Sequence, residues 1–433
     1  MSKKPRILIL TLSFGAGHVS AAQSIVGEFR KQIPEADLRL TDALENCSLP
    51  FKAFYVWTYW AMIRYAPRVW ERFFNSRIER RDEQTAPVWI WKKGCRKVFE
   101  EIRRFQPDLI VAAEVGASEI AVIARRENLT NAAVVNVITD YEAEPIWVKP
   151  EISAYAVAAG TVKKQLQNWG ANAEKIEVCG IPLDESFARK YDGDETRKRF
   201  NLDARPIVLL MGGGMGPTRM DEVAARLLER SANLNIVALP GKDKTAEIKL
   251  NRLSNSATTT LQVIGWTSSI APLMQAAQIL ATKPGGVTLS EAAACGLPLV
   301  LFDAIPGPEN ANAAHFVKAG AAILTKGSKH TADEILSLLR DDEKLRKMSA
   351  DCRKLAQPFA AQKIVELARR KIDLTNVAEK PSLASKKLSV SRRAFAVLRK
   401  LKRQENLSAY FADSKRKKSV EKLEQTLPEV KIG

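Results

Sequence analysis

The chain has 433 residues, of which 46% are hydrophobic and 27% are charged, and its formal net charge is +18. This length and composition predict two or three globular domains with substantial cores and exclude a mostly disordered chain. The positive charge favours a partner of opposite sign, either nucleic acid or an anionic membrane surface. Half of the excess lies in residues 371–433, which carry 16 Lys and Arg against 7 Asp and Glu.

The first residues lead directly into an apolar strand, Ile7–Leu12, which is too short for a signal peptide or a membrane span. We therefore expect a cytoplasmic protein. The cysteines are scattered, odd in number and without a CxxC pair, so we expect buried apolar side chains and neither a disulfide framework nor a metal site. They are Cys47, Cys95, Cys179, Cys295 and Cys352.

Two strands that each end in glycines predict the first turns of two α/β units. Ile7–Leu12 leads into a loop with Gly15 and Gly17, and Ile207–Met211 leads into Gly212–Gly216. Further apolar strands alternate with helical stretches, which predicts an α/β fold with two doubly wound halves. A linker is expected over Gly180–Arg205, with a ligand cleft between the halves. The further strands are predicted at 109–113, 133–138 and 236–239.

The segment 51–91 interrupts this pattern with five of the chain's eight tryptophans, Trp57 and Trp60 among them. Apolar residues at helical spacing predict one face of a helix that Pro67 divides in two, and arginines form a stripe on another face. Aromatic rings and arginines suit a helix at a lipid surface. The alternative is ordinary aromatic packing in a core. The apolar set is Tyr55, Tyr59, Met62, Ala66, Val69 and Phe73, and the arginines are Arg64, Arg68 and Arg72.

A run from 265 to 320 predicts a phosphate site. A strand at 278–282 leads through a turn containing Pro284, Gly285 and Gly286 to Thr288 and a helix at 289–295. Free N–H groups and the positive dipole end of a helix suit a phosphate.

Acidic and amide side chains follow in the same run. Glu291 is expected to accept hydrogen bonds from ribose hydroxyls. Glu309 and Asn310 follow the next strand, 298–302, at the edge where open α/β sheets bind ligands.

This run resembles the GT-B glycosyltransferases of family 28, in the branch that holds the monogalactosyl- and processive glucosyl-diacylglycerol synthases. The motifs that carry the resemblance are Lys283–Thr288, Glu291–Ala292, Gly296–Pro298 and Pro306–Ala313. The resemblance covers residues 5–365 and implies two Rossmann-like domains with a cleft between them. These are an acceptor- and membrane-binding domain over 1–182, with the insertion 51–91, and a UDP-sugar domain over 196–370. A basic tail follows over 371–433.

The resemblance also assigns roles. His18, in a Ser-x-Gly-x-Gly-His motif, is the implied general base, and its ordinary pKa suits that task. Gly17, Gly213 and Gly214 are implied to contact the donor phosphates, although a glycine run can also be only a tight turn. The implied uracil contacts are Gly265, Trp266 and Thr267. A core position is the alternative for the tryptophan.

The acceptor side departs from the family. Asp140 and Trp147 are implied to contact or orient the acceptor, but Glu144 stands where the family has a histidine. This carboxylate can contact the acceptor, orient His18 or lie solvated in a loop.

The leading hypothesis is an inverting, metal-independent transfer of a hexose from UDP-glucose or UDP-galactose to membrane diacylglycerol, by a protein attached to the inner face of the cell membrane. No cofactor is expected besides the donor substrate. One alternative is UDP-N-acetylglucosamine transfer to a polyprenyl-linked precursor. Another is an NAD-dependent oxidoreductase, because Gly15 and Gly17 partly match a dinucleotide fingerprint and Asp42 ends the predicted second strand. Nucleic acid is not expected as a partner, since the tail has few aromatic residues.

Overall fold

The computed structural model describes residues 4–13, 15–81, 84–212, 218–230, 232–267 and 270–375. The predicted donor contacts Gly213 and Gly214 and residues 376–433 of the basic tail lie outside this set.

The first half of the described chain forms a six-stranded parallel sheet in the order β2-β1-β3-β4-β5-β6. Its strands are short apolar runs, most of them buried on both faces, as parallel strands covered by helices require. The order in which strands are added to the sheet reverses between β1 and β3, and open α/β sheets bind ligands at such a point. The strands are β1 Arg6–Thr11, β2 Asp37–Asp42, β3 Leu109–Ala112, β4 Ala133–Val137, β5 Ala154–Val157 and β6 Ile176–Val178.

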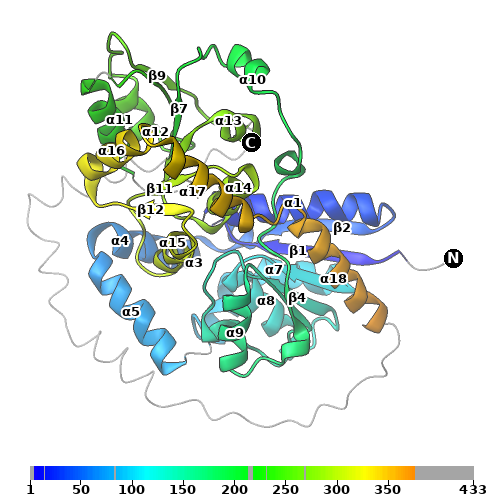
Figure 1. Ribbon diagram of the computed structural model, residues 1–433. Coiled ribbons are helices and arrows are strands. Elements are labelled where there is room, and N and C mark those ends of the chain that lie inside the picture. The colour runs from blue at the N-terminus through cyan, green and yellow to red at the C-terminus, as the bar shows by residue number, and fades with distance from the viewer. Residues whose placement is uncertain are drawn as a thin grey trace, which may run out of the picture. The chain divides into compact units, whose positions relative to one another are not determined.

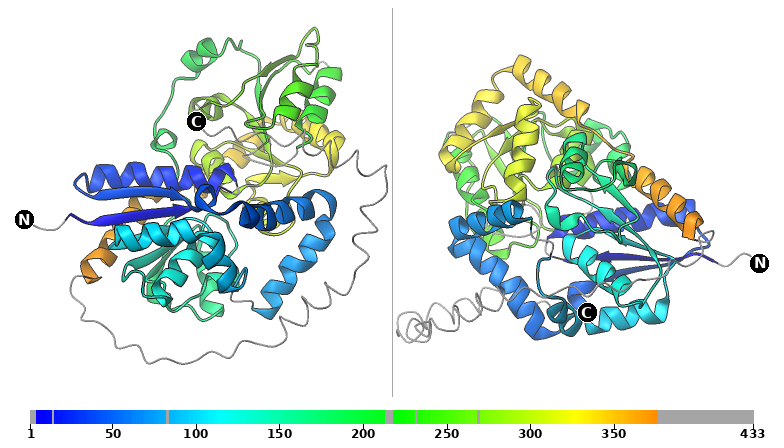
Figure 2. Two further views of the ribbon diagram at one scale, coloured as in Figure 1. Left: turned by 180° about the vertical axis from the view of Figure 1, so that it is seen from behind. Right: turned by 90° about the horizontal axis from the view of Figure 1, so that it is seen from below.

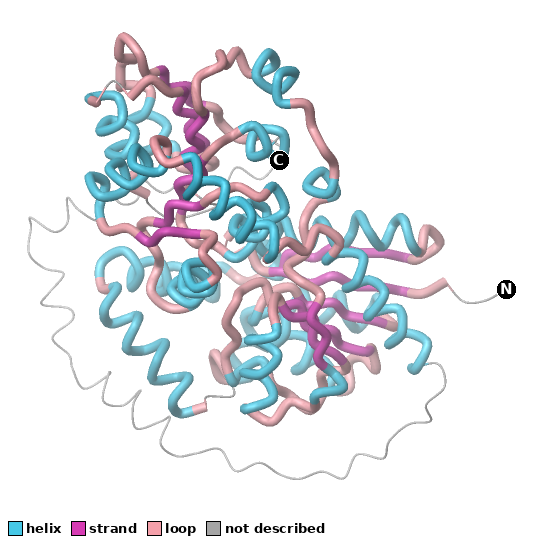
Figure 3. Tube along the Cα trace, in the orientation of Figure 1, coloured by secondary structure: helices cyan, strands magenta, loops and turns pink. Residues whose placement is uncertain are grey.

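The second half forms another six-stranded parallel sheet in the order β12-β11-β10-β7-β8-β9, with its reversal between β7 and β10. Figure 3 shows the strands in two groups, each accompanied by helices. The two doubly wound sheets confirm the predicted α/β fold. The strands are β7 Ile207–Met211, β8 Asn235–Leu239, β9 Thr260–Val263, β10 Ile279–Thr282, β11 Leu299–Leu301 and β12 Ala322–Leu324.

The helices cover both faces of each sheet and bury its apolar side chains (Figure 1). In the first half they are α1 Ala16–Gln32, α2 Ala43–Asn46, α3 Leu49–Lys52, α4 Thr58–Tyr65, α5 Pro67–Arg80, α6 Val88–Gly94, α7 Arg96–Phe105, α8 Val115–Arg126 and α9 Gly160–Asn168. In the second they are α10 Gly193–Arg199, α11 Met220–Glu229, α12 Lys244–Leu250, α13 Ile270–Ala276, α14 Gly286–Cys295, α15 Pro308–Lys318, α16 Gly327–Leu338, α17 Asp342–Lys354 and α18 Ala360–Thr375.

The last helix, α18, returns to the first sheet. Its residues Ile364, Val365 and Ile372 are buried with Ile7 and Phe29 of β1 and α1. The right-hand view in Figure 2 shows the orange α18 beside the blue α1. Residues 371–375, which the sequence places at the start of the basic tail, therefore continue a packed helix.

The aromatic insertion differs in detail from the prediction. The break at Pro67 is confirmed, since α4 ends at Tyr65 and α5 begins at Pro67. A π-helical turn over Ala53–Trp57 and the bent backbone at Ala66 change the phase of the helices. The predicted apolar face is wrong in part, because Val69 and Phe73 are exposed beside the arginines. The buried set is Ile63, Trp70 and Phe74, with Tyr59, Met62, Ile78 and Ile305 packed against it.

Candidate active site

His18 lies in the first turn of α1, directly after β1, at the point where the first sheet reverses. The N-cap of α1 is Gly15, which has no side chain to cover the free N–H groups. The His18 side chain is partly buried, and its Nδ1 forms a 2.8 Å hydrogen bond with Oγ1 of Thr139. Thr139 follows β4, so two strand ends fix the imidazole.

The surroundings of His18 keep its imidazole neutral. Burial lowers the pKa of His18 from its usual 6.5, and the Asp140 carboxylate and the backbone of Ala113 oppose this shift in part. A neutral imidazole can accept a proton, and a nearby carboxylate stabilises the imidazolium that results. The arrangement therefore suits a general base at neutral pH.

Asn312, on α15, connects this base region to the second half. Its amide Nδ2 donates to Oδ1 of Asp140 at 2.8 Å and to the Pro284 carbonyl at 3.1 Å, while its Oδ1 accepts from the Tyr141 N–H at 2.7 Å. The side chain is fully buried. Sequence reasoning did not single out Asn312 or Thr139. The signal for Asn312 was its place as the asparagine of the Pro306–Ala313 motif.

The two glycines before α14 have different surroundings. A Cβ on Gly286 would lie 2.1 Å from the Thr139 carbonyl oxygen, whereas a Cβ on Gly285 would meet nothing within 4 Å. Glycine is therefore needed at 286 because the backbone of the first half approaches it closely, whether or not a ligand binds there. Only Gly285 leaves open space of the kind that a close phosphate requires.

The helix α14 begins at Gly286, three residues before the predicted start, so Thr288 lies in its first turn. No side chain caps this N-terminus, and Gly17 of α1 would touch Val287 through an added Cβ at 3.4 Å. The free N–H groups at the starts of α1 and α14 are thus close neighbours. Such an arrangement favours an anion.

Two carboxylates predicted for donor binding lie on α14 and α15. Burial raises the pKa of Glu291 to about 8. Burial also raises the pKa of Glu309, opposed by Lys283, and Glu309 accepts a 2.7 Å hydrogen bond from the Ile305 N–H. Asn310 is exposed. Their contacts with a donor stay predictions.

The predicted uracil contacts follow β9. Trp266 is 68% exposed, so the alternative of a core position is wrong. The Nζ atom of Lys242 lies 5.8 Å from the centre of its ring. Gly265 has open space on its Cβ side, and Thr267 is partly buried. An exposed ring beside an open backbone can stack on a flat base.

On the acceptor side, Glu144 is neither solvated nor bonded to His18. Its carboxylate forms an ion pair with Arg77 of α5, and the two side chains are only 14% and 12% exposed. Burial raises the pKa of Glu144 and the Arg77 guanidinium opposes the shift. Trp147, in the short helix Pro145–Trp147, is buried in the core of the first sheet, and its acceptor contact stays a prediction.

The insertion reaches the second half as well as the first. Nε1 of Trp70 donates to the Pro306 carbonyl at 2.9 Å, and the ring of Phe74 lies against Gly307. The insertion also has exposed side chains, since Trp57 is 63% exposed and Arg68 and Arg72 are exposed too. Other exposed apolar side chains between residues 49 and 89 are Leu49, Phe54, Tyr65, Val69, Phe73 and Trp89.

The remaining membrane candidates behave differently. Trp60 is half-buried, with its Nε1 buried and its ring edge-on to Tyr59 at 5.3 Å. Exposure therefore supports a lipid contact for Trp57 more than for Trp60. The side chain of Arg64 lies outside the described part of the structure.

Asp42, the acidic residue of the oxidoreductase alternative, has a structural role. Its Oδ1 accepts hydrogen bonds from Leu44 N–H at 2.9 Å and Ser13 N–H at 3.2 Å. The carboxylate caps α2 and is bonded to the loop before α1. Backbone N–H groups therefore already occupy one oxygen atom of this carboxylate.

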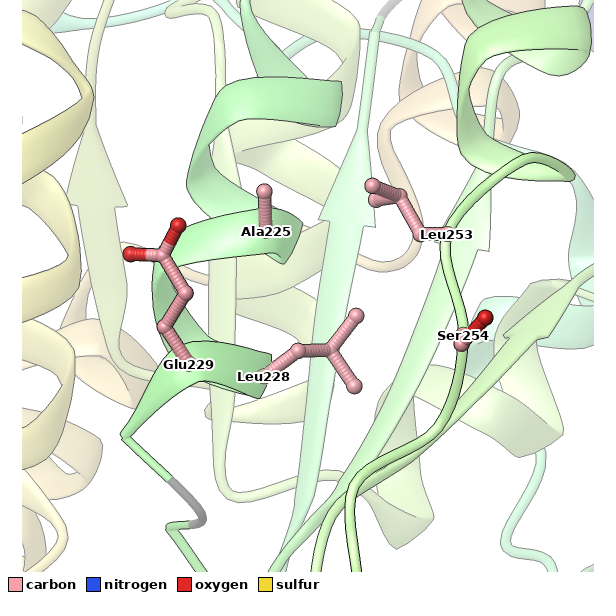
Figure 4. Close-up of a pocket in the computed structure, with 5 residues that line it drawn as sticks. All are labelled: Ala225, Leu228, Glu229, Leu253 and Ser254. Carbon is pink, nitrogen blue, oxygen red and sulfur yellow. The ribbon is translucent and has the colours of Figure 1, made fainter.

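The hollow drawn in Figure 4 lies between α11 and the chain after α12, and none of its lining residues is a predicted site residue. Its lining residues are Ala225, Leu228, Glu229, Leu253 and Ser254. Among the described helices, none has both the length and the apolar character that crossing a membrane requires. Within the same residues, no group of three or more His, Cys, Asp and Glu could hold a metal ion.

Comparisons with known proteins agree with this geometry. The family model of monogalactosyldiacylglycerol (MGDG) synthase matches residues 18–183, and that of glycosyl transferases group 1 matches residues 194–355. A processive diacylglycerol beta-glucosyltransferase of Bacillus cereus (strain G9842) is 29% identical, over 84% of this chain and 94% of its own length. Its counterpart in Bacillus mycoides (strain KBAB4) is 28% identical over the same shares.

Solved structures share the fold. Acinetobacter baumannii MurG superposes with a TM-score of 0.55 at 15% identity, covering 84% of this chain and 99% of MurG. Anabaena Alr3699/HepE in complex with UDP-glucose gives 0.51 at 17% identity, covering 86% of this chain and 100% of its own. The chain is a hexosyltransferase of the GT-B fold, and it is similar to the branch of family 28 that holds the monogalactosyl- and processive glucosyl-diacylglycerol synthases.

Proposed function

We propose that this enzyme transfers a hexose from UDP-glucose or UDP-galactose to diacylglycerol at a membrane surface, with inversion and with His18 as general base. The observation that carries the proposal is the position of His18, whose neutral imidazole is anchored to Thr139 beside the uncapped start of α14. A base and an anion site at one place are what glycosyl transfer from a nucleoside diphosphate requires.

In the proposed step, His18 takes the proton from the acceptor hydroxyl as that oxygen forms a bond to C1 of the sugar. The bond from C1 to the diphosphate oxygen breaks on the opposite face, and UDP leaves with the electron pair. The N–H groups at the start of α14 stabilise the charge that develops on the leaving group. Asp140 stabilises the imidazolium.

Diacylglycerol as acceptor is supported by the names of the relatives, which are processive diacylglycerol beta-glucosyltransferases. The exposed side chains of Trp57, Arg68 and Arg72 in the insertion support access to that lipid in a bilayer. Each such cation contributes on the order of 1 kcal/mol near an anionic membrane.

The direct test is incubation of the full-length protein with labelled UDP-glucose, UDP-galactose or UDP-N-acetylglucosamine and diacylglycerol vesicles, followed by lipid extraction. We expect label from one of the first two in a glycolipid, with the anomeric configuration opposite to that of the donor. His18→Ala should lower turnover by about two to four decades, while His330→Ala, at an exposed histidine of α16, should not. A parallel incubation supplies a polyprenyl-linked acceptor, and label transfer only from UDP-N-acetylglucosamine and only to that acceptor contradicts the proposal and supports the alternative.

Membrane binding is tested separately by vesicle sedimentation. Trp57→Ala should weaken binding to anionic vesicles more than Trp60→Ala, because only the first ring is largely exposed. A truncation that removes 379–433 retains all of α18, including the buried Ile372, and should weaken binding at low salt only. Wild-type protein that stays in the supernatant at low salt would contradict a lipid-surface enzyme.

A further inference from the structure

Two cysteines far apart in the sequence meet in the core. The Sγ atoms of Cys47 and Cys95, 48 residues apart, lie 2.6 Å from each other. Both side chains are buried, with exposed fractions of 6% and 0%. The sequence offered no CxxC pair, and most of the cysteines were expected to be buried apolar side chains. These two are buried, and the contact between them is a feature that the sequence did not predict.

The pair lies where the aromatic insertion leaves and rejoins the first half. Cys47 immediately precedes the segment that contains α3, and Cys95 immediately follows α6. The intervening neighbours are bonded too, since Ser48 N–H donates to the Gly94 carbonyl at 2.8 Å. We call Cys47, Ser48, Gly94 and Cys95 the neck of the insertion.

The neck is closely packed and holds the sulfur atoms in place. A Cβ on Gly94 would lie 2.2 Å from the ring of Phe51, so only glycine fits there. The Phe51 ring also packs on Trp91 with 5.2 Å between centroids. Packed backbone in both segments of the neck fixes the two cysteines relative to each other. A disulfide can then form without a large movement of the backbone.

We propose that Cys47 and Cys95 form a reversible redox site, oxidised by a peroxide to an intramolecular disulfide at the neck and reduced by a dithiol. The Cys47 thiolate attacks one peroxide oxygen, which gives a sulfenic acid and a hydroxide that is protonated to water. Cys95 then loses its proton, attacks the Cys47 sulfur and expels the second oxygen as water. Two thiols and one peroxide thus give one disulfide and two waters.

The order of reaction follows from the surroundings. The hydrogen bond with Cys47 and burial both raise the pKa of Cys95. Cys47 is also the less deeply buried of the two. Cys47 is therefore the sulfur that meets the oxidant, and Cys95 resolves the sulfenic acid before further oxidation.

The bridge closes the insertion into a covalent loop, whatever sugar or acceptor the enzyme uses. A cross-link over a loop of this length constrains the unfolded chain. The expected result is a rise in melting temperature on the order of 5 °C, reversed by a dithiol.

The experiment uses the full chain, treated with a few equivalents of hydrogen peroxide without denaturant, then denatured and alkylated. Wild-type protein should lose two of its five alkylatable thiols and two hydrogens in mass, with peptides containing Cys47 and Cys95 linked. Cys47→Ser and Cys95→Ser should each keep their remaining thiols, while Cys179→Ser, at an equally buried cysteine elsewhere, should still form the bridge. Circular dichroism establishes that the variants are folded.

Several results overturn the proposal. One is alkylation of all five thiols after peroxide treatment of the folded wild-type protein. Another is a bridge that involves Cys179, Cys295 or Cys352, or one that links two chains. Conversion of Cys47 to a sulfinic or sulfonic acid without a bridge also excludes it, because a positioned resolving thiol prevents that product.

Discussion

Replacing Gly286 by alanine tests whether this glycine serves the contact between the two halves. The added Cβ would lie 2.1 Å from the Thr139 carbonyl oxygen and 3.1 Å from Cδ1 of Ile181. Real Cβ atoms essentially never come closer than 3.0 Å to another heavy atom, so the Thr139 backbone must move by roughly 1 Å. Backbone cannot rotate away as a flexible side chain can.

The energetic terms have opposite signs. Alanine improves helix propensity at this position by at most about 1 kcal/mol, whereas overpacking costs about 1–3 kcal/mol or more. We therefore expect a net loss of stability. Thr139 also anchors His18 through a 2.8 Å hydrogen bond. A misplacement of about 1 Å in a catalytic group can lower turnover by about 100-fold.

Gly285→Ala is the matched control. Its φ of −70° and ψ of 132° suit any residue, and its Cβ would meet nothing within 4 Å. Melting curves without ligand, followed by initial rates at saturating donor, should separate the two variants. Gly286→Ala should melt earlier and turn over about 100-fold more slowly, whereas Gly285→Ala should melt like the wild type. Equal ligand-free melting temperatures for both variants would refute the steric argument and leave a role in ligand approach only.

Three other predictions follow from the buried charges. Because burial lowers the pKa of His18, activity should persist below pH 6.5. Asp140→Asn should move the loss of activity at low pH lower still, since Asp140 raises that pKa. Profiles of rate against pH measure both effects, and a loss of activity that sets in above pH 6.5 contradicts His18 as the general base. Glu291, whose pKa burial raises to about 8, gains its charge as the pH rises through that value, so UDP affinity should increase there if ribose hydroxyls donate to it. In Glu291→Ala, calorimetry should find no such increase with pH. The binding free energy of UDP should be weaker by about 1.5–3 kcal/mol for each hydrogen bond lost with a ribose hydroxyl. Arg77→Leu leaves the Glu144 carboxylate buried without its cation, which should lower the free energy of unfolding by about 3–5 kcal/mol. Adding Glu144→Gln should restore most of this loss, as denaturant unfolding can measure. An Arg77→Leu variant as stable as the wild type contradicts a stabilising role for the ion pair.

Most of the strands were predictable because they are short apolar runs, and two of them, β1 and β7, lead into glycine loops, whereas β5, β6, β9 and β12 were not predicted. Ile207–Met211 was predicted with the bounds that β7 has, and β10 begins one residue after its predicted start. A strand buried on both faces leaves a continuous signal that needs no partner to be recognised. His18 was found for a similar reason, since its neighbours along the chain form a compact motif.

Contacts between distant segments left no such signal. The partner of His18 is Thr139, 121 residues away, and nothing local distinguishes that threonine from others. Likewise, the ion pair of Glu144 depends on Arg77 in another helix. The helical phase of the insertion failed for a local reason, because a π turn and the bend at Ala66 shift the register in ways that a constant period of 3.6 cannot follow.

The long-range contacts share one consequence for catalysis. Thr139 bonds His18 through its side chain and meets Gly286 at the start of α14 through its carbonyl oxygen. The next residue, Asp140, is held by Asn312, which also bonds the Pro284 carbonyl just before α14. Under the proposed function, a diphosphate at the N-terminus of α14 would contact a helix that these two adjacent residues connect to His18. A variant that loosens this junction should therefore lose turnover even when its affinity for UDP is unchanged.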